Sequence, residues 1–424
     1  MLRLILYQVS DIHFPEHELG RSLDIKDRGF PSSVLSALGP PRLVAAMREL
    51  VRRTDADKDC ALAICGDLTS LGSIDGYREC VEYLVGTLQL TSDSWQLSSV
   101  HAVPGNHDVD RVSVPTHEHD PAEKFDALEQ VWSDRSVPVF AKHLRRTEMS
   151  DSGSGIDLYG LNSCVGCGEW RQLPDDLRDD LATIFRREAQ EAQTEADKGR
   201  WERLDTPAFF EQDADDLVAH MRATAPTRLP VIIAHHNLLP QAVPRISPYS
   251  ELLNGGMLRE RLGRLNRPLV YLHGHIHVSP VEVLTQPEFT RSRVVIVAAP
   301  QFVDGFNRLV FEFATDGQPI GLEVTPIRVQ DNGGYEDRPS LRISLAPPKE
   351  RPHSDLIQEV LDTVRANPGR MRYTQLRDVV KVAGKRPSEA RLQDALREAE
   401  WLGWLRLVDR QNAARFWVVE WLGA

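Results

Sequence analysis

Six short apolar runs, each followed directly by polar residues, constrain this 424-residue chain more than any other feature. They are too short for helices, and most are rich in Val, Ile and Leu, as strands buried on both faces should be. Between them, stretches such as 41–53 and 208–223 have apolar residues every three or four positions, the period of an amphipathic helix. The runs cover residues 4–9, 61–65, 100–103, 231–234, 269–272 and 294–298. This alternation predicts an α/β layered fold with its chemistry on loops beyond the strand ends.

Five motifs stand in a fixed order at or just past these predicted strands. They read Asp11-Ile12-His13, Gly66-Asp67, Gly105-Asn106-His107-Asp108, His235-His236 and Gly274-His275-Ile276-His277. Each motif alone is weak, because Asp, Asn and Gly are common in turns and caps at strand ends. A set of unrelated turns leaves the joint occurrence of all five in this order unexplained. The motifs therefore indicate one functional site.

The residue types in these motifs suit a pair of divalent metal ions. Imidazole and carboxylate ligands bind Mn, Fe, Zn or Co, and the motifs lack the thiolates of structural zinc sites. Asp11 and His13 are two residues apart, so on an extended segment their side chains would share one face and bind one ion. Asp67 could bridge two ions through its two oxygens, at the spacing of about 3.5–4 Å that suits in-line displacement at phosphorus. Two such ions, two aspartates and a bridging hydroxide leave about one positive charge, which attracts a phosphate ester.

The motifs resemble those of the calcineurin-like metallophosphoesterase superfamily, which read D-x-H, G-D, G-N-H-[DE], H and G-H-x-H. The resemblance covers residues 1–330 and implies a catalytic domain with a four-layer fold, in which two β-sheets are sandwiched between helices. It also implies two divalent metal ions as cofactors, with manganese the expected metal in vitro.

The resemblance assigns roles residue by residue. One ion would be bound by Asp11, His13, Asp67 and His277, and the other by Asp67, Asn106, His235 and His275. His107 would be the catalytic residue, near the leaving group, either as a general acid or as a clamp on the phosphate. We prefer His235 to His236 because the family's ligand directly ends its strand, although His236 stays an alternative.

Three further segments follow from composition and pattern. The highly charged stretch at about 175–203 is predicted to be a helical insertion, and 331–352, with its Gly and Pro residues, to be a linker. Residues 353–424 should form a small α+β unit that resembles a winged-helix domain, with Ser388 as the N-cap of its third helix. Its helices are expected at 355–365, 373–382 and 388–402, and its strands at 404–408 and 415–419.

Net charge bears on the substrate. The formal charge is −12, which disfavours tight non-specific binding of nucleic acid by the whole chain. Residues 353–424 carry 12 Lys and Arg against 10 Asp and Glu, a net charge of +2, which leaves −14 on the remainder. We expect a metal-dependent phosphodiesterase that acts on nucleotide-type substrates by in-line attack of a bridging hydroxide. A DNA or RNA nuclease guided by the C-terminal unit is the alternative, and a regulatory binding module with a scaffold metal fold is an alternative of another class.

Other features are less informative. No apolar run approaches the length of a membrane span, and the first residues lack a signal peptide's basic region, so a cytoplasmic protein without membrane contact is expected. Cys164 and Cys167 form the one C-x-x-C pair in the sequence, and we interpret them as incidental small residues. His17, Arg21, His117 and His119 lie where loops could touch substrate. The sequence predicts no oligomeric state.

Overall fold

The computed structural model describes residues 2–14, 41–57, 60–87, 100–110, 120–135, 137, 139–142, 144–149, 153–168, 180, 183, 205–240, 252–289, 291–345, 355–367 and 369–422. Its larger part contains a seven-stranded and a six-stranded sheet. The first sheet has the order β12 (Tyr335–Asp337), β11 (Pro319–Val329), β10 (Gly305–Phe313), β1 (Arg3–Val9), β2 (Cys60–Cys65) and β3 (Val100–Val103), and β13 (Leu341–Ser344) also pairs with β11. The second has the order β4 (Arg145–Met149), β5 (Gly155–Gly160), β6 (Arg228–Ile233), β7 (Pro268–His273), β9 (Arg293–Ala298) and β8 (Val281–Thr285).

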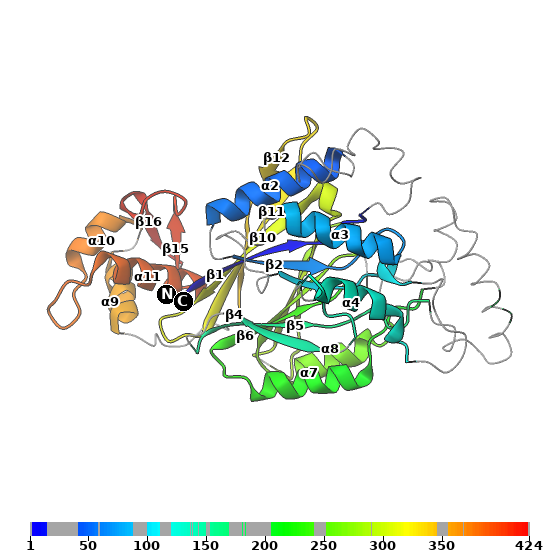
Figure 1. Cartoon of the computed structure of the whole chain (residues 1–424). Helices are drawn as coiled ribbons and strands as arrows, with labels where there is room; N and C mark the ends of the chain where they lie inside the picture. The colour runs from blue at the N-terminus through cyan, green and yellow to red at the C-terminus, as the bar shows by residue number, and fades with distance from the viewer. Residues whose placement is uncertain are drawn as a thin grey trace.

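The two sheets lie between two layers of helices (Figure 1). The helices α2 (Pro41–Asp57), α3 (Ile74–Thr87) and α4 (Asp126–Ser133) pack on the first sheet, and α7 (Glu211–Ala223) and α8 (Gly255–Gly263) pack on the second. This is the four-layer arrangement expected from the resemblance. The six apolar runs of the sequence all form strands, namely β1, β2, β3, β6, β7 and β9.

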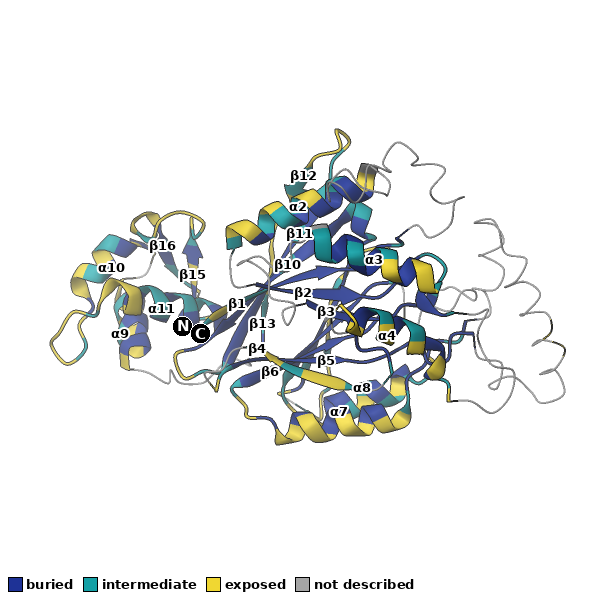
Figure 2. Ribbon diagram, viewed as in Figure 1, coloured by how far each residue is buried: buried dark blue, intermediate teal, exposed yellow. Residues whose placement is uncertain are grey.

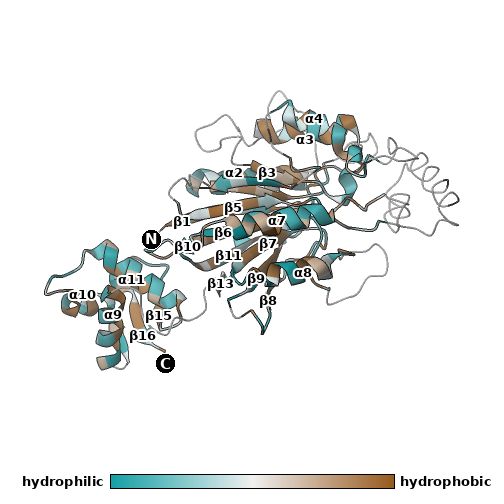
Figure 3. Ribbon diagram, turned by 90° about the horizontal axis from the view of Figure 1, so that it is seen from below, coloured by the Kyte–Doolittle hydropathy of each residue, from teal (hydrophilic) through white to brown (hydrophobic). Residues whose placement is uncertain are grey.

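Alternate residues of one strand serve two different cores. On β1, Tyr7 and Val9 face α2 and α3, whereas Leu6 faces the second sheet. The helices bury one face only, while the central strands are buried along their length (Figure 2). The same contrast appears in hydropathy, since the strands are largely apolar and the covering helices carry both kinds of residue (Figure 3). Burial on both faces therefore explains why these strands have continuous apolar sequences.

The predicted linker at 331–352 is wrong over much of its described part. The strands β12 and β13 lie inside it and pair with β11, so the first sheet continues to Ser344. The Asn332-Gly333-Gly334 segment forms the turn of the β11–β12 hairpin, in which Gln330 N donates to Gly334 O at 2.7 Å and Gly333 has a φ of +80°. The glycines thus mark a tight hairpin turn and not a domain boundary.

The C-terminal unit contains the expected three helices and a small sheet. Its elements are α9 (Asp355–Ala366), β14 (Arg370–Arg372), α10 (Tyr373–Val379), α11 (Glu389–Trp401), β15 (Leu405–Val408) and β16 (Val418–Trp421), and the strand order is β14-β16-β15. Ser388 is the N-cap of α11, as predicted, and its Oγ accepts from Arg391 N at 3.4 Å. The strand β14 was not predicted from the sequence. The winged-helix classification of this unit stays a prediction.

Two remaining expectations concern the insertion and membranes. Of the predicted insertion at about 175–203, the structure describes only Asp180 and Thr183, both helical, so that prediction lies outside the described residues. Within the described part of the chain, no helix combines the length and apolar character that crossing a membrane requires.

Candidate metal centre

The motif residues follow the carboxyl ends of parallel strands in both sheets. The strands β1, β2 and β3 are mutually parallel, as are β6 and β7, so within each sheet the loops leave from one edge. Backbone hydrogen bonds tie these loops together: Asp11 N donates to Gly66 O and Gly274 N to His235 O, both at 3.0 Å. His275 N donates to Asp11 Oδ2 at 3.0 Å, which joins a loop of the second sheet to a loop of the first.

Left-handed backbone conformations are concentrated at these loops. Eight non-glycine residues of the described chain have a positive φ, and five of them are motif residues with φ between 48° and 65°. These five are Asp11, His13, Asp67, His275 and His277. Residues other than Gly adopt this backbone conformation at a cost of about 1–3 kcal/mol each, and such strain is often found at functional sites.

The left-handed conformations correct one expectation. Asp11 and His13 were predicted to share a face because they alternate along an extended segment. Their φ values of 54° and 48° exclude that conformation, and β1 ends at Val9. The two side chains nevertheless approach each other, with His13 Nε2 3.9 Å from Asp11 Oδ1. The turn after the strand therefore brings them together, not strand alternation.

The first cluster consists of Asp11, His13 and His277. His277 Nε2 lies 3.0 Å from Asp11 Oδ1, and the ligand atoms of the three residues all lie within 4.8 Å of one another. His13 Nε2 is also 3.7 Å from Asp67 Oδ2. The donor set of one carboxylate and two imidazoles fits a divalent transition metal.

The second cluster consists of Asn106, His235 and His275. Asn106 Oδ1 lies 3.0 Å from His235 Nε2 and 3.1 Å from His275 Nδ1. The second ring nitrogen of His235, Nδ1, is 2.8 Å from the carbonyl oxygen of Cys65. Because a carbonyl oxygen only accepts, Nδ1 carries a proton, and in a neutral ring Nε2 then presents a lone pair to the Asn106 oxygen. The contact therefore needs a cation, either a proton on Nε2 or a metal ion bound by both atoms, and the second of these fits a metal site.

The electrostatics of the second cluster agree with that requirement. Burial disfavours a charged His235 but Asp67 more than offsets it and raises the pKa of His235 to about 10. The pocket therefore holds a positive charge on His235 when no other cation is present. Burial, followed by the charge of His235, lowers the pKa of His275 to about 3, which keeps that ring neutral and able to coordinate. Its Nε2 is buried and has no hydrogen-bond partner among the described residues.

Asp67 lies between the two clusters. Its Oδ2 is 3.7 Å from His13 Nε2 and 3.4 Å from His235 Nε2, so one oxygen faces both sets of histidines. Its Oδ1 accepts a hydrogen bond from His107 N at 2.9 Å. The expected bridge through two oxygens is therefore replaced by an arrangement in which a single oxygen faces both clusters. Burial opposes ionisation, but the neighbouring histidines, His235 first, hold the pKa of the Asp67 carboxyl well below its usual range.

Gly105 makes this position of Asp67 possible. A Cβ atom on Gly105 would lie 2.0 Å from Asp67 Oδ1 and 2.1 Å from Asp67 N. No shift of a flexible side chain could relieve the second contact, because it is with backbone. The glycine of the third motif is thus required by close approach.

His107 lies at the edge of the centre. Its Nδ1 is 3.1 Å from the carbonyl oxygen of Ser70, so Nδ1 donates and Nε2 is directed to the site, 4.0 Å from Asp67 Oδ2. The side chain is 16% exposed, and its ring meets that of His13 edge-on at 4.6 Å. The neighbouring His277 side chain is 47% exposed, so the side of the centre that contains His107 and His277 is the side open to solvent.

His236 lies beside the second cluster, with one ring nitrogen within 4.8 Å of ring nitrogens of His235 and His275, but it is His235 that also approaches Asp67, at 3.4 Å. Its Nδ1 lies 3.0 Å from Ser163 Oγ and 3.8 Å from Cys164 Sγ. Its ring packs against those of His235 and His275, with centroids 4.9 Å and 4.5 Å away. The geometry thus favours His235 over His236 as a ligand beside Asp67.

Two buried carboxylates support the centre, and the sequence analysis assigned neither a role. Asp108 accepts from the backbone of Gly105, Leu68 and Thr69, at 2.8, 3.0 and 2.8 Å, and so fastens the β2 and β3 loops together. Asp108 lies inside the third motif, which was the available signal. Asp205 accepts from Asn106 Nδ2 at 3.4 Å and turns the amide oxygen toward the histidines. Nothing in its local sequence indicates this role.

Four residues that the sequence places on loops able to touch substrate lie outside the described residues. These are His17, Arg21, His117 and His119.

The chain was compared with protein families and with known proteins. A family model described as calcineurin-like phosphoesterase matches residues 5–279. No curated protein matches the chain.

Solved structures show more distant likeness. A dimetal phosphatase from Danio rerio aligns with 14% identity and a TM-score of 0.46, over 81% of this chain and 99% of that one. A 5'-nucleotidase precursor from Thermus thermophilus aligns with 16% identity and a TM-score of 0.39, over 82% of this chain and 56% of that one. A purple acid phosphatase from yellow lupin aligns with 11% identity and a TM-score of 0.42, over 81% and 54% of the two chains.

Proposed function

Because the chain belongs to the calcineurin-like phosphoesterase family, and is therefore a metal-dependent hydrolase of phosphoric esters, we propose that it is a phosphodiesterase acting on nucleotide-type substrates. The observation that carries the proposal is the position of Asp67 Oδ2, within 3.7 Å of His13 and 3.4 Å of His235. One buried carboxylate oxygen between two imidazole clusters is suited to two cations that act on one phosphate.

The proposed ligands are those expected from the sequence. One divalent ion is held by Asp11, His13, Asp67 and His277, and the other by Asp67, Asn106, His235 and His275. When bound, the two ions supply Lewis acidity toward the phosphoryl oxygens and make water a nucleophile at neutral pH. Manganese is the metal we propose for activity in vitro.

The chain's own residues position and protonate the substrate. His107 Nδ1 donates a hydrogen bond to the Ser70 carbonyl oxygen. A second ring proton can therefore reside only on Nε2, the atom directed to the site. We assign this proton to the leaving-group oxygen. The Cys65 carbonyl fixes the ring of His235, and Asp205 fixes the amide of Asn106, so both ligands are oriented before substrate arrives.

A small substrate bound at the centre would not reach the C-terminal unit. Glu312 on β10 accepts a hydrogen bond from Arg410 of that unit at 2.8 Å. In the β1–β10 ladder, Glu312 lies opposite Arg3, at the amino end of β1. Asp11 follows the carboxyl end of the same strand. The seven residues of β1, at about 3.3 Å each, therefore separate the unit from the centre by about 20 Å. The net charge of −12 favours a small substrate over a nucleic-acid polymer.

A nuclease guided by the C-terminal unit is the second candidate. It is favoured by the contrast between the +2 of residues 353–424 and the −14 of the remainder. Against it, Arg370, Arg377 and Arg386 of that unit are engaged with Glu420, Glu389 and Asp378. A regulatory binding module without catalysis has less support, because every motif position that would bind a metal ion carries a residue able to do so.

The proposal is tested by hydrolysis of bis-p-nitrophenyl phosphate with added Mn²⁺. Replacing Asp67 by Asn should lower kcat/KM by more than about 100-fold, because the shared oxygen loses its charge. Asp75→Asn is the matched control, since Asp75 is 84% exposed and pairs only with Arg78 in the described structure. No turnover by the wild type, or equal turnover by the Asp67→Asn variant, would remove the basis of the proposal.

The substrate class is tested in the same preparation. Cyclic nucleotides, dinucleotides, single strands and duplexes are compared by kcat/KM. A preference for cyclic nucleotides or dinucleotides supports the proposal, whereas a preference for long strands that is lost on deleting residues 353–424 favours the nuclease.

A further inference from the structure

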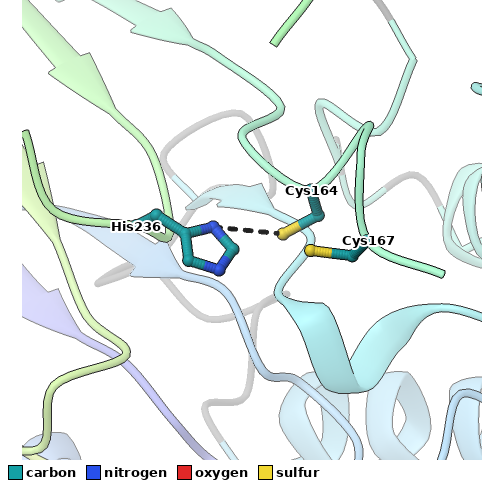
Figure 4. Close-up of side chains that lie close together, drawn as sticks. All are labelled: Cys164, Cys167 and His236. Carbon is teal, nitrogen blue, oxygen red and sulfur yellow. Dashed lines mark hydrogen bonds between the residues drawn. The ribbon is translucent and has the colours of Figure 1, made fainter. Parts of the chain in front are cut away.

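A third cluster of potential metal ligands, distinct from the two clusters of the centre, lies next to them. Cys164, Cys167 and His236 are all fully buried, and one ligand atom from each lies within 4.8 Å of the others. Figure 4 shows the two sulfur atoms side by side, with the imidazole directed toward Cys164. The sequence brings only the two cysteines together. His236 comes from the end of β6, 72 residues beyond Cys164, which is why the C-x-x-C pair alone looked incidental.

The spacing suits tetrahedral coordination. A sulfur and a nitrogen bound to one tetrahedral ion, at about 2.3 Å and about 2.1 Å, are about 3.6 Å apart. Cys164 Sγ and His236 Nδ1 are 3.8 Å apart. Cys167 N donates to Cys164 O at 3.0 Å, which closes a tight turn and leaves both sulfurs on one side of it.

The imidazole of His236 contacts Ser163 as well as Cys164. Ser163 Oγ accepts from the backbone N–H groups of His235 and His236, at 3.1 and 3.0 Å, so its hydroxyl proton is directed to His236 Nδ1. Nδ1 is then the unprotonated ring nitrogen, and an ion bound to it would take the lone pair that otherwise accepts from Ser163. The other nitrogen, Nε2, is buried and makes no hydrogen bond within the described part of the chain.

A buried positive charge lies beside the cysteine turn. Lys124 is 4% exposed, and its Nζ donates to the carbonyl oxygens of Val165 and Cys167 at 2.6 Å each. These two carbonyls belong to the C-x-x-C segment itself. Two thiolates, a divalent ion and this ammonium group together carry a net charge of +1, the same as the ammonium group beside two neutral thiols, so binding of an ion adds no net charge to this buried region.

We propose that Cys164, Cys167 and His236 form a third metal site, which takes a thiolate-preferring ion of the zinc class and is separate from the centre at Asp67. On binding, both thiols lose their protons to solvent and the sulfurs become ligands. The fourth position is filled by water or by the Pro104 carbonyl, which lies 3.5 Å from Cys164 Sγ. Soft sulfur ligands distinguish this site from the nitrogen and oxygen ligands of the centre.

The site has a structural consequence for the centre. Gly168, directly after the cysteine turn, donates through its N–H to Asp205 Oδ1 at 3.1 Å, and Asp205 Oδ2 accepts from Asn106 Nδ2. An ion that fixes the turn therefore also fixes the carboxylate that orients Asn106. The three residues of the site act as positioning residues and do not touch substrate.

The first test uses the unmodified chain, prepared without oxygen and loaded with Co²⁺ or Zn²⁺. X-ray absorption at the zinc edge should show sulfur at about 2.3 Å, and the Co²⁺ form should show a sulfur-to-cobalt charge-transfer band. Spectra with only nitrogen and oxygen ligands, or a Cys164–Cys167 disulfide found by mass spectrometry in the anaerobic protein, would overturn the proposal.

Variants then separate this site from the centre. The double variant Cys164→Ser with Cys167→Ser should bind about one ion fewer per chain and lose the charge-transfer band. Cys80→Ser is the matched control, because Cys80 is equally buried and lies outside the cluster. Asp67→Asn should lose phosphodiesterase activity but keep the band, so the two proposals fail independently. A band that persists in the double variant or disappears in Asp67→Asn contradicts a separate site.

Discussion

His107 separates two functions within one residue. Its backbone N–H donates to Asp67 Oδ1, while its ring is held through Nδ1 by the Ser70 carbonyl and directs Nε2 to the site. A change of side chain therefore leaves the support of Asp67 intact. The family resemblance left open whether this ring is a general acid or a clamp on the phosphate, and the two roles differ in their dependence on the leaving group.

Replacing His107 by Asn tests that choice. A general acid contributes about 10²–10⁴-fold to kcat, and most where the leaving group is a poor one. We expect a loss within this range on an alkyl phosphodiester and a much smaller loss on bis-p-nitrophenyl phosphate, because p-nitrophenolate leaves without a proton. The metal content of the variant should equal that of the wild type. Equal losses on both substrates would assign His107 to the clamp role.

At this scale, the sequence predicts which side chains converge but not how. All seven proposed ligands lie in the two clusters or between them, because motif identity and strand ends are properties that the sequence contains. The left-handed backbone at Asp11, His13 and Asp67 was not predicted, since propensity disfavours it and only the surrounding contacts impose it. Asp205 was also missed, because its role depends on a contact with a residue 99 positions away.

At the scale of elements, an ion-pair cluster joins the end of α2 to the first sheet. Asp57 accepts from Tyr7 OH on β1 at 2.7 Å and from Arg308 Nη2 on β10 at 2.8 Å. Burial raises the pKa of Asp57, but the hydrogen bonds from Arg308 and Tyr7 more than offset it, so the pKa is lowered overall. The cluster therefore stabilises the fold while Asp57 is ionised.

The pH dependence of stability follows from the sign of that shift. A carboxyl with a folded-state pKa below its unfolded value of about 3.9 contributes fully above that pH and loses its contribution as pH falls through the folded pKa. Replacing Asp57 by Asn should thus cost about 1–3 kcal/mol at pH 7, and clearly less at about pH 3. Urea unfolding at both pH values measures the difference. Asp55→Asn, on an exposed position of the same helix, should be neutral; a cost for Asp57→Asn that does not vary with pH would contradict the account.

Some elements were predictable and others were not, for reasons of burial. The strands β2, β6, β7 and β9 are buried along almost their whole length, so they have continuous apolar sequences. In contrast, the edge strands β12 and β13 are short, partly exposed and polar, and nothing in their sequences separates them from loop. Only their pairing with β11 makes them strands.

At the scale of the whole molecule, one tryptophan joins the C-terminal unit to the first sheet. Trp401, at the end of α11, is 5% exposed and packs against Ala314 and Ile320. Its Nε1 donates to Glu312 Oε2, and the Arg342 guanidinium lies 4.3 Å from its ring centroid. This contact lies at the amino end of β1, away from the metal-binding loops.

Replacing Trp401 by Ala should release this junction without affecting the centre. Loss of a buried tryptophan costs about 3–5 kcal/mol, so the C-terminal unit should unfold at a lower temperature than the sheets in differential scanning calorimetry. Hydrolysis of bis-p-nitrophenyl phosphate should be unchanged. Phe416→Ala is the control, because Phe416 is 55% exposed in the same unit. A calorimetric profile for Trp401→Ala that matches this control would show that the junction contributes nothing.

The central claim is that Asp67 is shared by two metal ions, and anomalous diffraction from crystals soaked in Mn²⁺ tests it most directly. We expect two manganese peaks about 3.5–4 Å apart, both within coordination distance of Asp67 Oδ2, one beside His13 and the other beside His235. A single peak, or two peaks of which only one touches Asp67, would contradict the claim.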